Sequence, residues 1–560
     1  MPNPSIHFFE QYTHHVEFDL DGEKLIGELT ITPSKVPRLQ VHTHDAHILM
    51  AENRLIAHPL LVKELGKNKF FTLHDASLQR GSLVPTYITK GVDVKEIDTI
   101  EIGLTGISVW FERLRSYEIS DSQLSRDIHI DKFNECFGFR SSSYSITNAR
   151  EIESTQNTPT QHSINIQDRI VITKKTGHFI FNEIKDIAHQ VRNLFSLLLG
   201  QSLSITDVYV MNSINRARFQ SLHFLTASYK LEPLDNFHQS FSSFSDIQSA
   251  NLWGTIIRNF FEKEMFRSIW NRLVPSFSQT GYWDYEILSV VVTLEMYCKF
   301  VSEGKGHNLS KNKYNTLKEA LEDTLITFRG LEQLSEEDEL VLAGVKSAIS
   351  NIKNTSHPTL KQKYEYLVHS TNQQIKDAID FTDENFRTIK KIRDSIAHGL
   401  SYKSVVQGEV TIENQIKDKL LVLLMYYVFQ ELGFSDSQIA KYLNHNLLPF
   451  VMNAGGNERA RDLLAGTARF IALNTPFDDE SIEAFKPIVV TYEQGTSFYT
   501  LNKELTSKTQ SNWLNSGFRD VRDFVRNQIS QSDDLEYINK LYLTNGDKED
   551  IYYGVILVTR

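Results

Sequence analysis

The hydrophobic periodicity of the chain changes near residue 250, and this change constrains the fold more than any other feature. Before it, apolar and polar residues alternate, as in VEFDL at 16–20, and a period of two predicts β-strands with one buried face. After it, from 252 to about 447, apolar residues recur every three to four positions, which predicts amphipathic helices. We therefore expect an α+β multidomain protein with strands and helices in separate domains.

A chain of 560 residues is too long for a single hydrophobic core. We expect a β-rich N-terminal domain over 1–235, an all-α helical bundle over 250–447 and a small mixed α/β C-terminal extension over 450–560. Proline is nearly absent from the bundle, and its two prolines, Pro275 and Pro358, fall between predicted helices. These helices span 253–273, 285–301, 317–331, 337–352, 360–368, 384–397 and 415–432.

Other local patterns predict the remaining elements. Asp21-Gly22 predicts the turn of a hairpin between strands at 16–20 and 25–31, and Gly200 predicts the end of a helix over 184–199. The segment 141–165 is rich in Ser, Thr, Asn and Gln, and we expect a long surface loop. The tail predicts helices at 459–472 and 518–531, strands at 488–492 and 497–501, and a hairpin of 537–543 with 551–559.

Composition excludes several classes of protein. The two cysteines, Cys136 and Cys298, are too few for a disulfide scaffold or a cysteine zinc site, and they fit a cytoplasmic location. The start of the chain shows no signal peptide, and the longest apolar stretches, at 420–429 and 194–199, fall far short of the roughly 20 residues that span a bilayer, so we expect no membrane contact. With a net charge of −11, any contact with nucleic acid must use a local basic patch.

The segment FTDENFRTIKKIRDSIAHG (381–399) predicts a well-delimited helix. Thr382 is a good N-cap, and Phe381 and Phe386 stand where a hydrophobic staple forms. An isoleucine stripe faces the core, Gly399 can end the helix in the left-handed conformation, and His398 falls on the last turn. The stripe comprises Ile389, Ile392 and Ile396, and the basic residues beside it are Arg387, Lys390, Lys391 and Arg393.

Arg393 and His398 together suit the cleavage of RNA without a metal ion. The reaction needs a base for the 2′-OH, an acid for the leaving oxygen and cationic donors for the charge that builds up on phosphorus. Histidine can carry the proton near neutral pH, and arginine offers a fixed fork of donors to phosphate oxygens. Attack by the 2′-OH would leave a 2′,3′-cyclic phosphate, and neither a cofactor nor a metal ion is expected.

The spacing of Arg393 and His398 is weak evidence by itself. With 25 arginines and 19 histidines in the chain, chance gives about two to three pairs of similar spacing. Arg38 with His44, and Arg216 or Arg218 with His223, are such pairs. Only Arg393 and His398 combine a predicted helix, an acidic residue after the arginine (Asp394), a glycine after the histidine and a surrounding bundle.

The segment KKIRDSIAHG (390–399) resembles the signature of HEPN ribonucleases, in which a polar residue follows the arginine and precedes the histidine. A β-rich domain before such a bundle resembles ApeA-type anti-phage proteins, as do the segments at 189–210 and 290–300. The resemblance covers roughly 15–445 and is specific only at the R-x4-H segment. It implies that Arg393 binds phosphate, that His398 is catalytic, that Asp394 is the polar residue of the motif, and that Glu295 is a supporting glutamate.

The resemblance also implies how such a protein works. Two copies would form a homodimer, or a higher homo-oligomer, with the two R-x4-H helices facing each other across a shared site. Activity would stay off until a phage-encoded trigger appears, and cleavage of RNA, with tRNA as the expected target, would cause abortive infection. We expect Arg387, Lys390 and Lys391 to contact the RNA.

Two other functions remain open from the sequence. The bundle could be a non-catalytic HEPN-like module that binds a partner. Alternatively, the H-x-H-D-x-H pattern formed by His42, His44, Asp45 and His47 could hold a metal ion in a metal-dependent hydrolase, since imidazole and carboxylate groups suit zinc. No further His or Asp ligands follow at convincing positions, and a polar strand or loop explains this pattern equally well.

Overall fold

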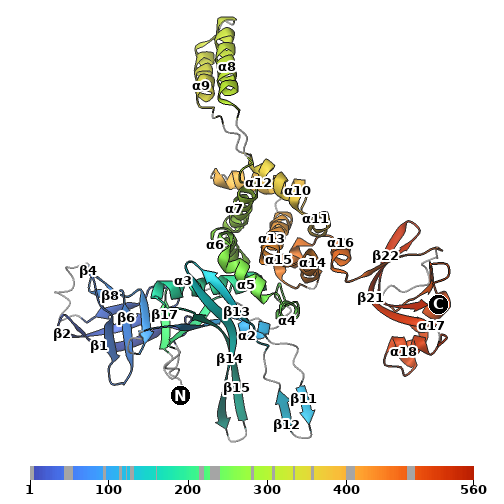
Figure 1. Ribbon diagram of the computed structural model, residues 1–560, viewed down its shortest axis with the longest axis horizontal. Helices are drawn as coiled ribbons and strands as arrows, with labels where there is room; N and C mark the ends of the chain where they lie inside the picture. Colours follow the sequence, from blue (N-terminus) through green and yellow to red (C-terminus); the bar gives the residue numbers. More distant parts are fainter. Residues whose placement is uncertain are drawn as a thin grey trace. The chain divides into compact units, whose positions relative to one another are not determined.

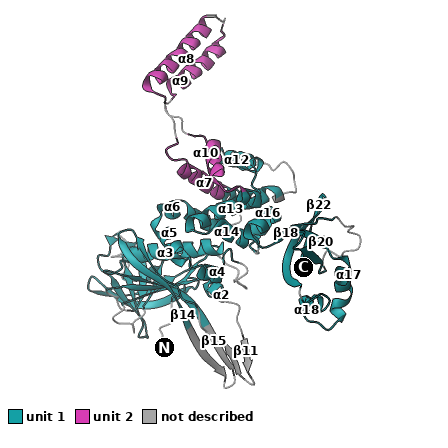
Figure 2. Cartoon of the chain, turned by 45° about the vertical axis from the view of Figure 1, so that its right-hand side comes forward, with its two compact units in different colours: residues 1–287, 374–560 teal, residues 288–373 magenta. Residues whose placement is uncertain are grey.

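The computed structural model divides the chain into two compact units, residues 1–287 with 374–560 and residues 288–373 (Figure 2). The residues that the structure describes are 6–42, 54–91, 96–111, 117–120, 123–126, 131–158, 161–212, 220–227, 240–278, 283–305, 309–331, 334–352, 354, 358–398, 410–444, 446–475, 486–531 and 533–560. Among their helices, none is long and apolar enough to cross a membrane.

The first unit begins with a large antiparallel sheet, whose first half carries its own apolar core (Figure 1). In β1 the predicted alternation is confirmed, because Val16, Phe18 and Leu20 are buried and the residues between them are exposed. The predicted turn is also confirmed, with positive φ angles of 55° at Asp21 and 87° at Gly22. This half contains β1 (Tyr12–Leu20), β2 (Glu23–Ile31), β3 (Arg38–Val41), β4 (Arg54–Leu55), β5 (Leu60–Glu64), β6 (Phe70–His74), β7 (Ser77–Gln79), β8 (Ser82–Val84) and β9 (Tyr87–Lys90).

The second half of the sheet continues from β9 through β17 (Gln220–Phe224), β16 (Ile205–Met211), β10 (Thr99–Leu104), β15 (Gln161–Lys174), β14 (Ser142–Thr158) and β13 (Asn134–Phe139). The expected loop at 141–165 is wrong, because β14 and β15 form a long hairpin there with residue-by-residue pairing (Figure 1). The polar composition hid the strands, since the ladder needs only backbone groups and tolerates Ser and Thr on its faces. A short α2 (Ile107–Phe111) and the small hairpin of β11 (Tyr117–Ser120) and β12 (Gln123–Arg126) also belong to this region.

Helix α3 (Phe181–Leu199) packs against this half of the sheet. Twelve of its side chains are buried, and it ends at Gly200, whose φ of 66° is left-handed, as predicted. A Cβ at Gly200 would also meet Leu448 and Phe241 at 2.7 and 3.0 Å.

A buried ion pair joins β15 to β16 across the intervening strand β10. Gly103 of β10 pairs with Arg169 on one side and with Asp207 on the other, and the Arg169 guanidinium crosses over it to Asp207. The guanidinium also lies 4.5 Å from the ring centre of Tyr209, and it donates to Gln167 at 2.7 Å. A Cβ at Gly103 would collide with Oγ1 of Thr206 and lie 2.9 Å from Oδ2 of Asp207, so this arrangement requires a residue without a side chain at position 103.

The helical part of the first unit is built around α13 (Val410–Leu432), which is buried on all sides over 420–429, as its apolar sequence predicts. It contacts α5 (Trp253–Glu262), α12 (Asp383–Ala397), α14 (Asp436–Asn444) and α15 (Pro449–Ala454), and Lys417 joins it to Glu286 at the start of α7 (Trp283–Val301). The same part of the chain contains α4 (Phe244–Ser249), α6 (Glu264–Ser268), η3 (Trp270–Phe277) and α11 (Gln373–Ile379). The C-terminal end of α13 is capped from α5 and the residue after it. Asn259 Nδ2 donates to the Leu432 carbonyl at 3.1 Å, and Lys263 Nζ donates to the Glu431 carbonyl at 2.9 Å.

The single helix expected over 253–273 is wrong, because three shorter helices occupy this stretch. The first break is at Lys263, whose backbone is extended with φ −79° and ψ 119°. Its side chain contacts the end of α13, and this tertiary contact is invisible in the local sequence pattern.

The second unit contains the rest of α7 from Leu288, and α8 (Lys311–Leu331), α9 (Glu336–Ser350) and α10 (Leu360–Ser370) (Figure 2). Each of these helices was predicted. α7 and α8 begin two and six residues before their predicted starts, α9 begins one residue earlier and ends two residues earlier, and α10 ends two residues later. Capping boxes begin α9 at Ser335 and α10 at Thr359.

The C-terminal part of the first unit is a five-stranded mixed sheet with helices α17 (Lys503–Asn512) and α18 (Val521–Arg526) on one face. The strands lie in the order β18 (Arg469–Ala472), β21 (Asp534–Asn545), β22 (Lys548–Thr559), β19 (Val489–Glu493), β20 (Phe498–Leu501). The helix expected over 459–472 is wrong in its second half. Helix α16 (Glu458–Ala465) stops at Gly466, whose φ is 66°, and β18 follows. The α+β class with a β-rich start, central helices and a small mixed end is confirmed.

Gly103 provides a test of the buried ion pair. We expect Gly103→Ala to destabilise the N-terminal sheet by about 2–4 kcal/mol, because the added methyl group collides with Thr206 and Asp207, whose side chains are hydrogen-bonded to each other, and leaves Arg169 poorly paired. Amide hydrogen exchange in β10, β15 and β16 would measure the loss. Gly138→Ala in β13 is the matched control, since its Cβ would meet nothing closer than 3.6 Å. Equal protection in the two variants would contradict the account.

Candidate active site on helix α12

Helix α12 begins as the sequence predicts. The Thr382 hydroxyl accepts a hydrogen bond from the Asn385 amide at 3.2 Å, and the Asn385 side chain accepts one from the Thr382 amide at 3.1 Å. This reciprocal capping box satisfies two backbone donors of the helix and fixes its first residue. Phe386, at the staple position, is buried.

The turn before α12 is held to α13. Asp380 takes a left-handed conformation with φ 56°, and its carboxylate pairs with Lys419 Nζ at 2.7 Å. Lys419 also donates to the Asp380 backbone carbonyl at 3.0 Å. The start of α12 is therefore fixed both by its own cap and by a contact to the buried helix of the bundle.

One side of α12 faces the core and the other faces solvent. Ile389 and Ile392 are buried as predicted, and Ile396, the third residue of the predicted stripe, is only half-buried. The helix ends at His398, whose φ of −90° and ψ of 9° depart from helical values, and whose amide donates to the Asp394 carbonyl at 3.1 Å. His398 lies on the last turn as expected, and its side chain is exposed. Gly399, predicted to end the helix, lies outside the described residues.

The solvent side of α12 carries a shallow depression of about 460 Å³. It is lined by Arg387, Lys390, Lys391, Asp394, Ser395 and His398. These residues recur at helical spacing, so they share one face of α12 over three turns. Three cationic side chains and one carboxylate surround the exposed imidazole, which makes the depression suitable for a phosphodiester.

Arg393 lies beside this depression and does not line it. Its Nη1 donates to Oδ1 of Asp394 at 2.7 Å, and the two side chains are 34% and 40% exposed. Asp394 therefore connects the arginine to the face that carries His398. An ion pair this exposed is worth about 0–1 kcal/mol, so a phosphate group can replace the carboxylate as the acceptor of the guanidinium.

Sequence reasoning missed Ser395. Its hydroxyl donates to the Lys391 carbonyl at 3.0 Å, and the residue lines the depression. Its position, four residues after Lys391 and three before His398, places it on the same helical face and could have identified it.

Glu295, the expected supporting residue, lies on α7 in the second unit and is half-buried. Its charge adds to the effect of burial on Cys298, one turn further on, and together they raise the pKa of that thiol to about 12. Cys298 therefore stays a protonated thiol at neutral pH, unsuited to act as a nucleophile. Any action of Glu295 on Arg393 stays a prediction.

The competing arginine–histidine pairs gain no support as catalytic pairs. His223 is buried in β17, stacks on Phe8 with ring centres 4.5 Å apart, and has a pKa lowered to about 4 by burial. It is a core histidine. Its partners Arg216 and Arg218, and also His44, lie outside the described residues.

The metal hypothesis concerns residues that the structure covers only in part. His42 follows β3 and is exposed, whereas His44, Asp45 and His47 lie outside the described residues. Within the described ranges, no three His, Cys, Asp or Glu side chains gather as metal ligands would.

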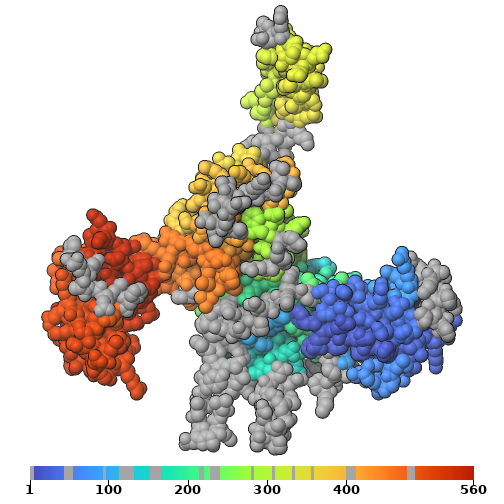
Figure 3. All heavy atoms as spheres, turned by 180° about the vertical axis from the view of Figure 1, so that it is seen from behind, coloured from blue at the N-terminus to red at the C-terminus, as the bar shows by residue number. Residues whose placement is uncertain are grey.

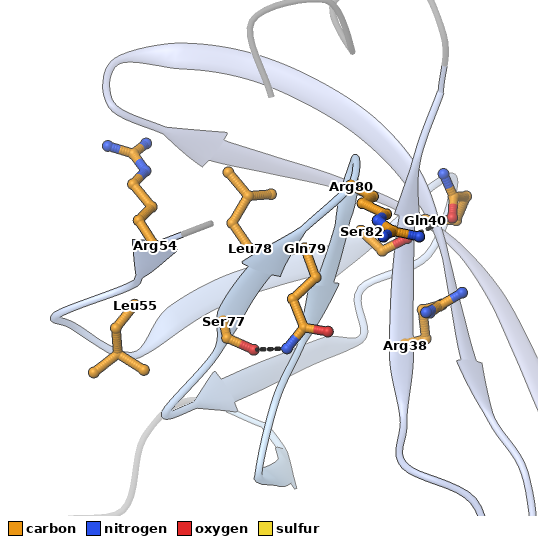
Figure 4. Close-up of a pocket in the computed structure, with 9 residues that line it drawn as sticks. All are labelled: Arg38, Gln40, Arg54, Leu55, Ser77, Leu78, Gln79, Arg80 and Ser82. Carbon is orange, nitrogen blue, oxygen red and sulfur yellow. Dashed lines mark hydrogen bonds between the residues drawn. The ribbon is translucent and has the colours of Figure 1, made fainter. Parts of the chain in front are cut away.

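A second hollow, of about 790 Å³, lies on the N-terminal sheet between β3, β4, β7 and β8 (Figure 4). Its lining includes Arg38, Arg54 and Arg80, with Gln40 and Ser82 linked by a hydrogen bond of 2.6 Å. Arg54 pairs with Asp21, and Figure 4 shows the guanidinium groups of Arg38 and Arg54 on opposite sides of the hollow. Because these cations do not converge on one point, the depression on α12 is the better candidate site.

The cap of α12 provides a local test. Thr382→Ala should weaken the first turn by about 1 kcal/mol, because the Asn385 amide loses its acceptor, and should speed amide exchange at Asn385 about five-fold. Exchange at single amides is the appropriate measurement, since a multidomain chain need not unfold in one step. Thr382→Ser keeps the acceptor and should exchange as the wild type does. Equal acceleration in both variants would argue against the cap.

The chain matches two family models. The model described as ApeA N-terminal domain 1 matches residues 14–254, which cover most of the β-rich region, and the model described as Apea-like HEPN matches residues 288–438, from α7 to the start of α14. Together the two matches cover well over half of the chain. No curated protein and no solved structure matched in the same comparisons. The chain is therefore an ApeA-like protein, with an ApeA N-terminal domain followed by an ApeA-like HEPN domain.

Proposed function

We propose that this protein is a metal-independent endoribonuclease of anti-phage defence, with its active site on the exposed face of α12. The ApeA-like HEPN domain supports a nuclease-type effector. The observation that carries the proposal is the shared placement of His398, Lys390, Lys391 and Arg387 around one depression, with Arg393 next to it.

In this mechanism His398 moves a proton and the cations stabilise charge. A base removes the proton of the 2′-OH, O2′ attacks the adjacent phosphorus, and the bond from phosphorus to O5′ breaks. An acid then protonates O5′, which leaves a 2′,3′-cyclic phosphate on one product and a 5′-OH on the other. Arg393 would donate to the phosphate oxygens once phosphate displaces Asp394, and Lys390, Lys391 and Arg387 would position the RNA backbone.

One chain supplies half of this machinery. The reaction needs a base and an acid, whereas the lining of the depression contains one histidine, His398. A homodimer that places two α12 helices face to face would supply the second imidazole and a second Arg393. We therefore propose a composite site across a two-fold axis, in which Glu295 supports the arginine.

The biological setting belongs to the same proposal. We infer tRNA as the target, a phage-encoded trigger that releases the activity, and abortive infection in the cytoplasm as the outcome. The competing possibility is a basic surface that binds RNA without cutting it. The pairing of Arg393 with Asp394 gives this alternative one point of support, because the carboxylate occupies the donor that would bind phosphate.

The catalytic claim predicts that Arg393→Ala and His398→Ala abolish cleavage of total tRNA, by a factor of at least 10³, while EDTA leaves wild-type cleavage unchanged. His369→Ala is the matched control, since His369 is another exposed histidine on the last turn of a helix. Because the proposed activity depends on a trigger, the same four chains should also be compared in phage-infected cells. Equal protection by wild type and His398→Ala would contradict the catalytic role of His398. Cleavage that requires a metal ion would indicate a different active site.

The basic face predicts a separate effect on binding. In the His398→Ala background, which cannot cut, Lys390→Ala with Lys391→Ala should weaken RNA binding and lower the slope of log affinity against log salt by about 1.4 to 1.8. Lys503→Ala with Lys508→Ala, on the exposed α17, should leave the slope unchanged. An unchanged slope in the first pair would place the RNA elsewhere.

A further inference from the structure

The α8–α9 hairpin is a defined element of the second unit with little core of its own. At its tip Arg329 forms a bidentate pair with Glu339, and at its base Lys318 Nζ donates to the Ser350 carbonyl at 3.2 Å. Beyond the base, Asn354 exchanges two hydrogen bonds with the backbone of Leu309, of 3.0 and 2.8 Å. Figure 1 labels the two helices side by side, and Figure 3 shows their atoms, in yellow-green and yellow, as one elongated group.

This hairpin exposes an unusual amount of apolar surface. Ile349 is the one buried apolar residue among the described side chains of α8 and α9. Leu340 and Val341 are 75% and 65% exposed, and Ile326 is 68% exposed. Such a concentration on two helices marks a surface that binds another protein. The other exposed apolar residues are Leu317, Phe328, Val345 and, just after α9, Ile352.

The apolar residues follow helical spacing. In α9, Val341, Val345 and Ile349 stand at i, i+4 and i+8, which share one helical face. In α8, Leu317, Leu321 and Phe328 stand at i, i+4 and i+11, which also share one face. Each helix thus carries an apolar stripe of about three turns, as the helices of a four-helix bundle do, although two helices alone cannot cover both stripes.

The distribution of charge along the hairpin favours a second copy of the same hairpin as its partner. The base is basic: residues 311–318 contain Lys311, Lys313 and Lys318 and no carboxylate, and Lys346 lies in the second half of α9. The tip is acidic, because α9 opens with four successive carboxylates (336–339), beside the C-terminal half of α8. Two hairpins side by side in the same direction would oppose like charges. Two hairpins in opposite directions would place each acidic tip on a basic base.

We propose that the α8–α9 hairpin is a self-association surface, on which the hairpins of two copies pair antiparallel as a four-helix bundle. The arrangement is isologous, since each copy offers the same tip and the same base. It requires the charge asymmetry that the hairpin displays, whereas an RNA or an anionic membrane would be repelled by the tip. The interface does not involve α12, and it stands whether or not the protein cuts RNA.

The apolar part of the interface is tested by sedimentation of the full chain over a range of concentrations. Val341→Gln with Val345→Gln should weaken self-association at least ten-fold and leave helix content unchanged, since both side chains are exposed in the single chain. Leu514→Gln is the control, because Leu514 is 79% exposed in the C-terminal part of the chain. Equal assembly of the variant and the control would overturn the proposal.

The orientation is tested by reversing charges. Lys311→Glu with Lys313→Glu, or Glu336→Lys with Glu337→Lys, should each weaken self-association and lessen its loss with salt. Mixing the two variants should restore association between unlike chains, and combining all four changes in one chain should restore association with itself. Restoration in neither case would overturn the antiparallel pairing. RNA cleavage assays remain independent of these results, so the two proposals can fail separately.

Discussion

Burial of residues 420–429 of α13 on every side is the constraint on which the helical part of the first unit depends. A helix that is apolar on every side cannot lie on a surface, so neighbouring helices must surround it. α14 packs against it through Tyr442 and Phe429, whose ring centres are 6.1 Å apart, and α15 contacts it through Asn453 and Asp418 at 3.3 Å. The carbonyl of Leu432, at the C-terminal end of α13, accepts a hydrogen bond from Asn259 of α5. Helix α5 also packs on β13 through Phe261 and Phe137. The same buried helix thus links the sheet region to the helix that carries the candidate site.

Sequence periodicity predicted the class of each region well and failed where tertiary contacts override local pattern. The β1–β2 hairpin and α3 were predictable because apolar spacing and a glycine gave the same answer. The three short helices that begin at Trp253 were not predictable. The break at Lys263 occurs where this residue bonds to the end of α13, about 170 residues away in sequence. The long hairpin of β14 and β15 escaped prediction because its composition is that of a loop, while its stability comes from backbone pairing.

The candidate site was predictable to the extent that it lies on one helix. The N-terminal cap, the isoleucine stripe and the final histidine of α12 are local features, and each could be predicted from residues 381–398 alone. Two things were not local. Arg393 proved to be tied to Asp394 and to sit beside the depression, which depends on side-chain conformation. The anchoring of Asp380 by Lys419 joins residues 39 apart in sequence, and no spacing rule announces it.

Gly103 has a consequence for how sequences of this kind can change. The position is closed to side chains because Thr206 and Asp207 occupy the space above it, where Asp207 pairs with Arg169, and removing one partner of a buried ion pair costs more than removing both. A chain that changes only one of the three positions is therefore less stable than a chain that changes all of them. Residues 103, 169 and 207 should accordingly vary together among related chains: a relative with a side chain at the glycine position should also have replaced the arginine and the aspartate by apolar residues.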